Sequence, residues 1–509
     1  MEILTRAGAL AFLPLATAIL VVIWALMGIY KRNYWRARGI PQHLTNTLIG
    51  VHGPFYLRER AFAEHTIDLY NAHPGARYYG SFDLLTPVIV LKDPVIIRDV
   101  CVKYFDHFHD HNSFVTEDMD PVVGRNVFSL TGARWKDMRR TLTPNFTARK
   151  MKGMVKLVAE CSKKFVGYFE EHPEVAACFE ATDTFTRYAN DAIVSTAFGI
   201  HVDSMNDQGN NLYRHSKEVA SFLNSWKLLA FRLVPKLMRL LGVKFLSKAT
   251  DAFFKGMIGG TVRTREELGI ARQDMIDSLL QAKRSRDPVE VTNEDIVSQA
   301  LIFLIGGFDT TSSLTCSLAY ALASNPKVQD KAQREIDELM LEGGDGVITY
   351  ERLGDMKYFD MVISETLRMY PPTPLTDRLC TKRITIPGCK EGSPDFIVEV
   401  GTSVIIPMHG VHNDPKYFPE PEKFIPERFG QENRDKVTPF TYMPFGLGQR
   451  MCIGKRFALM EIKILFAQLL SKYSLSFAGK TRLPLALRKD SPSTRFVGGL
   501  WLKLDKRDL

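Results

Sequence analysis

The chain has 509 residues, of which 45% are apolar and 24% charged, and its net charge is +9. This composition is ordinary for a globular protein. Because the charges lie in short mixed clusters rather than in blocks, nucleic-acid binding has little support, and a basic surface for an acidic protein partner fits better. The seven cysteines are odd in number and irregularly spaced, which argues against a disulfide framework and favours a reducing compartment.

An uncharged segment runs from Ala7 to Tyr30. A helix of this length rises about 36 Å, which is enough to cross the hydrocarbon core of a bilayer. The segment is longer than the apolar part of a secretory signal and has no small-residue cleavage site. We therefore interpret it as a retained anchor rather than a signal peptide or a buried core helix.

The residues that flank this segment predict its orientation. Basic side chains follow it, and the positive-inside rule then places the rest of the chain in the cytosol. These basic residues are Lys31, Arg32, Arg36 and Arg38. Nearby aromatic side chains suit the interfacial belt of a membrane. They are Trp24, Tyr30, Tyr34 and Trp35.

The remaining pattern predicts an anchor at residues 1–30, a linker at 31–48 and one domain at 49–509. Residues 76–93 alternate and are rich in β-branched and aromatic side chains, which predicts a hairpin. From residue 94 onward the pattern is mainly helical, so the predicted fold class is mainly α with a smaller β lobe. Further predicted elements are helices at 327–342, 358–370 and 454–472, strands at 383–407 and a Pro-rich irregular segment at 412–444.

One predicted helix is much longer than the others. Thr292 is a good N-cap, Asp295 lies in the first turn, and apolar periodicity continues until Asn325 and Pro326 stop it. About 32 residues give a rod of about 48 Å, which is long enough to cross the domain.

The sharpest chemical signal is the segment Phe-Gly-Leu-Gly-Gln-Arg-Met-Cys-Ile-Gly, which begins at Phe445. A lone cysteine is most often an inert buried thiol, but Cys452 lies at the start of a predicted helix, whose free N–H groups favour a thiolate. Gly448 and Gly454 leave room for a flat macrocycle to approach the backbone. Arg450 offers a fork to a carboxylate such as a haem propionate, and Phe445 can shield the sulfur from water.

In this loop the sequence resembles the cytochrome P-450 superfamily, whose haem-binding loop has the form Phe-x-x-Gly-x-Arg-x-Cys-x-Gly. The resemblance implies the P-450 fold with an N-terminal transmembrane helix, haem b as the cofactor and Cys452 as the ligand of its iron. It covers about residues 35–505. Within this superfamily the sequence most resembles the animal microsomal type, in particular insect and vertebrate members that metabolise xenobiotics.

Three charged residues match a structural network of the same family. Glu365 and Arg368 lie three apart, on one face of a predicted helix, and Arg428 adds a second arginine in the irregular segment. Such a pair alone is usually a solvated contact on a helix surface. The resemblance implies that the three form a buried network that locks the core around the haem loop and takes no direct part in catalysis.

The long helix carries Gly306-Gly307-Phe308-Asp309-Thr310. Two glycines inside a helix cost about 1 kcal/mol each against alanine, so they need a reason, and we expect them to open space for dioxygen. A buried threonine often only bonds to the carbonyl four residues earlier. The resemblance implies instead that Asp309 and Thr310 are catalytic and deliver protons.

Three more residues match haem contacts of the family. Trp135 and Arg139 lie four apart and match a Trp-x-x-x-Arg pair at a propionate, while Arg378 matches a further propionate-binding arginine. Without the resemblance, a Trp–Arg pair at this spacing is more often a stacking contact on a helix surface.

Two other patterns favour ordinary explanations. His107, His109 and His111 alternate, but no cysteine or carboxylate lies at a recognised metal-ligand spacing, so we expect no metal there. Asn145 begins a glycosylation sequon that should be unused on the cytosolic side.

The chain contains no dinucleotide or flavin motif, so electrons must come from another protein. The resemblance implies NADPH-cytochrome P-450 reductase, with cytochrome b5 as an optional helper, and docking is expected at basic residues on the cysteine side. These are Lys136, Arg140, Lys455 and Arg456.

The function that the resemblance implies is insertion of one oxygen atom of O2 into lipophilic small molecules. These are xenobiotics, plant toxins, insecticides or endogenous lipids and steroids, met at the cytosolic face of the endoplasmic reticulum membrane. A haem-based sensor and a reductase-independent peroxide isomerase are the alternatives. The apolar stretch at 225–255 either dips into the bilayer or packs between helices.

Overall fold

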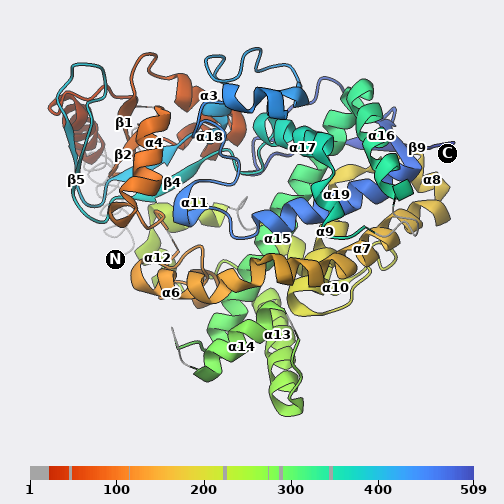
Figure 1. The fold of residues 1–509 in the computed structure, drawn as a ribbon. Helices are drawn as coiled ribbons and strands as arrows, with labels where there is room; N and C mark the ends of the chain where they lie inside the picture. Colours follow the sequence, from red (N-terminus) through yellow and green to blue (C-terminus); the bar gives the residue numbers. More distant parts are fainter. Residues whose placement is uncertain are drawn as a thin grey trace, which may run out of the picture.

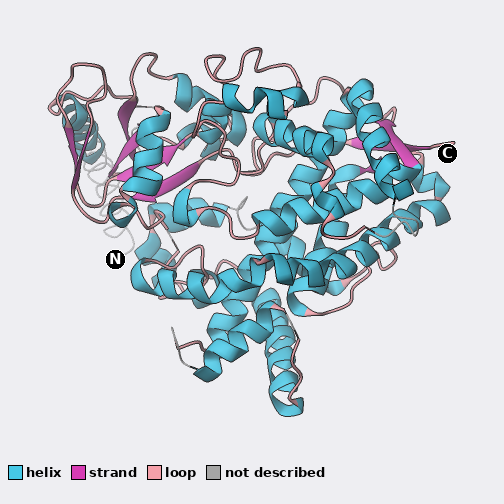
Figure 2. Ribbon diagram, in the orientation of Figure 1, coloured by secondary structure: helices cyan, strands magenta, loops and turns pink. Residues whose placement is uncertain are grey.

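Long helices form the body of the protein, and strands gather at two ends of it (Figure 2). The computed structural model describes residues 22–44, 49–113, 115–221, 226–272, 274–285, 290–342 and 348–508. This architecture confirms the predicted class, mainly α with a smaller β part.

The helices follow the chain in this order: α2 Gly53–Tyr56, α3 Phe62–Asn71, α4 Pro94–Arg98, α5 Pro121–Gly124, α6 Gly132–Leu142, α7 Ala148–Glu171, α8 Pro173–Ala176, α9 Ala181–Phe198, α10 Asn211–Ser221, α11 Trp226–Leu233, α12 Pro235–Leu240, α13 Lys248–Leu268, α14 Met275–Ser285, α15 Asn293–Ser324, α16 Pro326–Glu342, α17 Lys357–Met369, α18 Met408–His412 and α19 Lys455–Lys472. The strands are β1 Tyr78–Asp83, β2 Thr86–Leu91, β3 Phe179–Glu180, β4 Thr376–Leu379, β5 Ile384–Ile386, β6 Phe396–Val398, β7 Ser403–Ile406, β8 Tyr473–Phe477 and β9 Trp501–Lys506. Short turns used below are η1 Asp99–Lys103, η6 Pro426–Phe429 and η8 Gly448–Arg450.

The largest sheet in the described part of the chain has the strand order β1-β2-β7-β4. β1 and β2 form an antiparallel hairpin that pairs Tyr78 with Leu91, which confirms the hairpin predicted at residues 76–93. β2 runs parallel to β7, and β4 is antiparallel to β7. A second sheet, β3-β9-β8, lies at the opposite end of the body (Figure 1).

The helix α15 crosses the middle of the body (Figure 1) and contacts α9, α13, α17 and α19. It has 32 residues, or about 48 Å. Thr292 and Asp295 form a capping box at its start, and the chain leaves the helix at Asn325, so the predicted limits are confirmed. By length and composition α15 is the one described helix that could span a membrane, but most of it is buried inside the protein, as a core helix would be.

A helix also covers residues 22–36. Trp35 is fully buried, donates from its indole Nε1 to the Ser81 carbonyl at 2.8 Å and fills the space that a Cβ at Gly80 would need. The prediction that Trp35 belongs to an interfacial belt is therefore wrong, because its ring attaches this helix to the sheet. The first part of the predicted anchor, residues 7–21, lies outside the described residues.

Candidate functional site

The loop around Cys452 is shaped by its own hydrogen bonds and by two glycines. The amide of Cys452 donates to the carbonyl of Phe445 at 2.9 Å, which closes the loop just before α19. Gly446 and Gly448 have φ values of +76° and +70°, a region that favours glycine. A Cβ at Gly448 would lie 2.0 Å from the Cys101 carbonyl oxygen. Gly448 is therefore required by close packing against η1, a reason that differs from the one predicted.

Cys452 presents accessible surface, although protein surrounds it on most sides. This burial raises the pKa of its thiol. The backbone N–H groups of Gly454 and Lys455 and the positive charges of Arg139 and Lys455 act in the opposite direction. The sulfur thus faces the positive end of α19, where a thiolate is best stabilised.

One face of α15 is partly exposed although most of the helix is buried. The residues of this strip are Ile302, Phe303, Ile305, Gly306, Asp309 and Thr310, while Leu304 and Phe308 on the other face are buried. Phe303 stacks on Phe146, with ring centroids 5.6 Å apart, and a Cβ at Gly454 would meet the Phe146 ring at 3.9 Å. Phe146 therefore links the strip on α15 to the loop that carries Cys452.

The two glycines of α15 have different structural roles. A Cβ at Gly306 would meet no atom within 4 Å, so this position faces open space, as the sequence predicted. A Cβ at Gly307 would lie 2.7 Å from the Ile193 side chain on α9. Gly307 is needed for close packing of two helices and leaves no room for a small ligand.

The two predicted catalytic residues are both engaged in hydrogen bonds. The Thr310 hydroxyl donates to the Gly306 carbonyl at 2.6 Å, the ordinary arrangement for a threonine in a helix. Asp309 accepts from Arg495 at 2.8 Å and from the Ser493 hydroxyl. Sequence reasoning missed both partners, because nothing in a pattern connects position 309 to a loop 186 residues away.

Arg450 is held by protein groups. Its guanidinium donates to the His109 carbonyl at 2.7 Å, the Leu130 carbonyl at 3.0 Å and the Asp110 carboxylate at 3.2 Å, and it lies 3.9 Å from the centre of the Trp135 ring. Burial lowers the pKa of Arg450 to about 9, although Asp110 opposes this shift. The contact of Arg450 with a propionate stays a prediction, and Asp110 is a site residue that the sequence did not reveal.

Two neighbouring histidines lie beside carboxylates. His109 lies 2.7 Å from Asp110, and His111 lies 2.9 Å from Asp377. Both side chains therefore take part in the charged surroundings of Arg450 and Arg378.

Arg139 and Arg378 both donate hydrogen bonds to the cysteine loop. Arg139 donates to the Met451 carbonyl at 2.7 Å, and Arg378 donates to the Leu447 carbonyl at 3.1 Å. Arg378 is buried, and its Nε has no hydrogen-bond partner among the described residues. An unpaired guanidinium N–H suits an acidic group, and the Cys452 sulfur suits iron. These residues fit a haem.

Glu365, Arg368 and Arg428 lie together in a buried network. Arg368 donates twice to Glu365, at 2.8 and 2.9 Å, and Arg428 donates to the same carboxylate at 3.3 Å. Arg368 also donates to the His412 carbonyl at 3.0 Å, and the His412 Nε2 accepts from the amide of Met443 at 3.0 Å. Burial holds the pKa of His412 well below its usual range, which keeps the ring a neutral acceptor. The contact between His412 and Met443 joins the network to the chain just before the cysteine loop.

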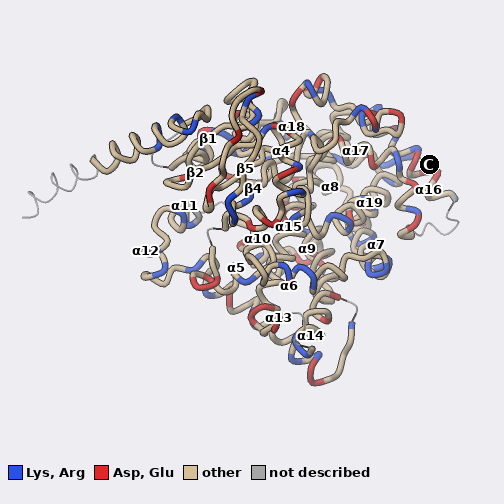
Figure 3. The backbone as a smooth tube through the Cα atoms, turned by 60° about the vertical axis from the view of Figure 1, so that its left-hand side comes forward, with Lys and Arg blue, Asp and Glu red and all other residues tan. Residues whose placement is uncertain are grey.

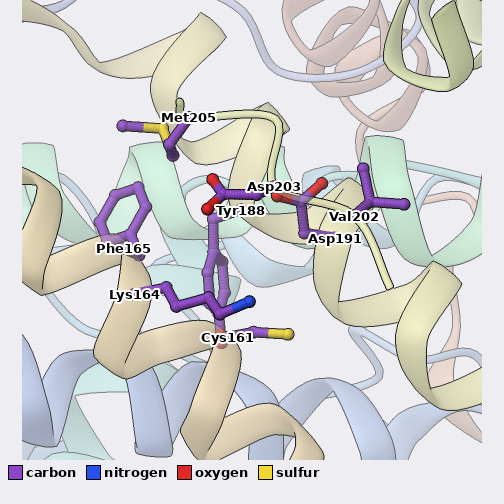
Figure 4. A pocket seen from close by; sticks show the side chains of 8 residues that line it. All are labelled: Cys161, Lys164, Phe165, Tyr188, Asp191, Val202, Asp203 and Met205. Carbon is purple, nitrogen blue, oxygen red and sulfur yellow. The ribbon is translucent and has the colours of Figure 1, made fainter. Parts of the chain in front are cut away.

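A small pocket between α7, α9 and the following loop lies apart from this site (Figure 4). It contains none of the predicted site residues. Burial, with Asp191 and Glu461 nearby, raises the pKa of Cys161 to about 12, so this sulfur is held as a thiol and is a poor ligand. The asparagine of the sequon, Asn145, is buried and accepts from the Ser278 hydroxyl at 2.6 Å.

Comparison with known proteins gives the family. The model of the cytochrome P-450 family matches residues 54–495. Cytochrome P-450 9e2 of Blattella germanica is 41% identical, with 97% of each chain covered. Probable cytochrome P-450 9f2 of Drosophila melanogaster is 36% identical, over 94% of this chain and 96% of its own length. Cytochrome P-450 6k1 of Blattella germanica is 32% identical, with 96% of each chain covered. With its cysteine loop at the start of α19 and matches that span nearly the whole chain, this protein belongs to the cytochrome P-450 family of haem-containing monooxygenases.

Proposed function

We propose that this enzyme oxidises lipophilic small molecules with electrons from NADPH-cytochrome P-450 reductase, and that Cys452 is the ligand of the haem iron. Haem, when bound, activates dioxygen so that one oxygen atom of O2 can enter the substrate. The observation that carries the proposal is the position of Cys452, whose sulfur faces the backbone N–H groups at the start of α19. Arg139 and Arg378 donate to carbonyls of the same loop, and Arg450 belongs to it. These three are the proposed haem-binding arginines.

The proposed substrate class rests on the partly exposed strip of α15. Ile302, Phe303 and Ile305 make it mainly apolar, and Phe146 extends it toward the cysteine loop. Pockets with apolar walls and few polar groups select ligands by burial of apolar surface. This supports xenobiotics such as plant toxins and insecticides, or endogenous lipids and steroids, as substrates.

The polar end of the same strip is proposed to handle protons. Among the described residues of this strip, only Asp309 and Thr310 have an acidic or hydroxyl side chain. We assign Thr310 to hold a proton or water next to the reacting oxygen and Asp309 to supply that proton.

Reconstitution with reductase and NADPH tests the function. A panel of plant toxins, insecticides and steroids should include compounds that yield hydroxylated or dealkylated products, with one O2 consumed for each product. Oxygen consumption without product from any compound would favour a sensor instead. Conversion of a fatty hydroperoxide without reductase would favour an isomerase.

The electron donor is proposed to dock on the basic side chains around the start of α19. Arg140 on α6 and Arg456 on α19 are exposed, and Arg140 is also paired with Asp137 at 3.2 Å. Lys136 is paired with Asp106 at 3.4 Å. Lys455 lies 5.5 Å from the Phe445 ring and adds positive charge at Cys452, so it is less suitable for a docking test.

We expect the variant Arg140→Glu/Arg456→Glu to raise the reductase concentration that gives half-maximal turnover by about tenfold, because charges at the rim of an interface mainly control association. Turnover at saturating reductase should change little. The matched control is Lys327→Glu/Arg334→Glu on α16, which lies away from α6 (Figure 1). Equal effects of the two variants would exclude docking at α6 and α19.

Membrane contact is proposed for the surface of α11 and α12 together with the exposed helix before Lys31. Figure 3 shows that the helix that begins at residue 22 projects from the body on the side where α11 and α12 lie. Phe231 and Phe245 are buried, whereas Leu237, Leu240 and Leu241 are exposed, so the stretch both packs inward and presents an apolar surface. Exposed leucines next to the proposed anchor favour insertion into the bilayer interface. They support a membrane location, for which we propose the cytosolic face of the endoplasmic reticulum.

A fluorescent label on Leu240→Cys should be quenched by bromine-labelled lipids when the full chain is reconstituted into phosphatidylcholine vesicles. The same label on Leu341→Cys is the control, because the two leucines are equally exposed, 82% and 81%, and Leu341 lies on α16. Quenching should be confined to position 240. If both labels respond alike, α12 does not contact the bilayer.

A further inference from the structure

The loop of residues 491–496 is attached to the middle of α15. Arg495 Nη2 donates to Asp309 Oδ1 at 2.8 Å, and the Ser493 hydroxyl donates to Asp309 Oδ2. One turn further along α15, the Ser313 hydroxyl donates to the Thr494 carbonyl at 2.9 Å. The loop therefore holds α15 at the proposed proton donor and also beyond it.

The ion pair between Arg495 and Asp309 differs from a surface pair. The two side chains are only 13% and 17% exposed, and Arg495 Nη2 also donates to the Ser312 hydroxyl at 3.0 Å. Burial alone would lower the pKa of Arg495, but Asp309 and the hydrogen bond to it raise this pKa overall. Just before this loop, Arg488 and Asp490 form a pair whose side chains are 49% and 33% exposed. Removal of one partner should matter much more in the buried pair.

Asp309 and Thr310, the two residues proposed to handle protons, are hydrogen-bonded to different partners. Both carboxylate oxygens of Asp309 accept from the loop, and the Thr310 hydroxyl donates to the Gly306 carbonyl. Within the described residues, Asp309 and Thr310 share no side-chain hydrogen bond. A proton can pass from the Asp309 carboxyl group to Thr310 only after Asp309 changes its partners.

We propose that Arg495, with Ser493, is a positioning residue for Asp309, and that release of Asp309 by this loop permits proton delivery at Thr310. The inference rests on the proposed proton-supplying role of Asp309. In each cycle a solvent hydronium gives one proton to the carboxylate as it leaves Arg495. The carboxylic acid passes that proton to the strip and returns as a carboxylate to Arg495, so one proton enters and one leaves.

The direct test is Arg495→Met in the haem-loaded full chain, with a fluorogenic alkoxycoumarin ether as the probe substrate. We expect product formed per NADPH to fall by about tenfold and hydrogen peroxide to rise, because Asp309 then has no partner to return to between transfers and delivers protons at the wrong stage. The solvent deuterium isotope effect on product formation should change as well. Iodosobenzene donates an oxygen atom without protons, so turnover driven by it should stay within about twofold of wild type.

Two further variants separate positioning from folding. Arg495→Lys keeps a positive charge without the planar fork and should restore part of the coupling. Arg488→Met removes the more exposed pair just before the loop and should leave coupling and turnover unchanged. If Arg495→Met lowers the NADPH-driven and the iodosobenzene-driven reactions equally, Arg495 acts on the fold or on substrate binding, and the proposal is overturned.

Hydrogen exchange gives a readout that does not depend on turnover. Loss of the buried contact should speed amide exchange in residues 491–496 of both Arg495→Met and Asp309→Asn, because local opening becomes easier. Unchanged exchange in both variants contradicts the attachment. Asp309→Asn also tests the proposed function by itself: unchanged coupling in this variant removes the proton-supplying role. A loss of coupling in Asp309→Asn without any loss in Arg495→Met overturns only the positioning role of Arg495.

Discussion

Replacement of Cys452 by serine is expected to abolish NADPH-driven monooxygenase activity and to remove the red-shifted Soret band of the ferrous carbonyl complex. A serine hydroxyl stays protonated at neutral pH and cannot donate electron density as a thiolate does. The backbone N–H groups of Gly454 and Lys455 that favour a charged sulfur would face a neutral oxygen. Visible absorption of the reduced, carbon monoxide-treated protein is the measurement.

A matched control separates this effect from the loss of any cysteine. Cys178→Ser replaces a partly exposed cysteine far from the loop in sequence and should leave the spectrum and the activity unchanged. If the red-shifted band survives in Cys452→Ser, the assignment of the iron ligand is wrong.

The second large effect is expected from Glu365→Gln. Glu365 and Arg368 are fully buried, and the carboxylate accepts from Arg368, Arg428 and the Ile425 amide. Removal of its charge leaves the buried guanidinium of Arg368 uncompensated, which costs about 3–5 kcal/mol. Because Arg368 also holds His412, and His412 holds Met443 before the cysteine loop, haem retention should fall together with thermal stability. Haem content after gel filtration and the unfolding midpoint are the measurements.

The exposed pair between Arg60 and Asp68 supplies the control. Its geometry is good, with Nε and Oδ2 2.8 Å apart, but both side chains face solvent. Exposed ion pairs contribute little to stability, so Asp68→Asn should leave the midpoint and the haem content nearly unchanged. Equal losses in the two variants would mean that burial of Glu365 is not the cause.

The proposed mechanism places different demands on neighbouring parts of α15. Gly307 serves the packing against α9, whereas Gly306, Asp309 and Thr310 belong to the partly exposed strip. A change at Gly307 therefore affects the fold before it affects the chemistry. Substitutions that test oxygen activation are better made at positions 309 and 310.

The sequence alone determined the features whose cause is local. The capping box at Thr292 and the stop at Asn325 set the limits of α15, because both depend on contacts within one helical turn. The hairpin at 76–93 follows from alternation along neighbouring residues. The cysteine loop could be recognised because its cysteine, arginine and glycines lie within ten consecutive positions.

Only the tertiary structure decided which distant side chains meet. Asp110 and Arg450 are 340 residues apart, and Asp309 and Arg495 are 186 apart, so no local pattern could pair them. Burial of Trp35 against Gly80 was equally hidden, since the same tryptophan suits a membrane interface when only its neighbours in sequence are known. The physical reason is that periodicity and capping depend on a few neighbouring residues, whereas the partner of a buried charge or ring depends on how whole helices and sheets pack.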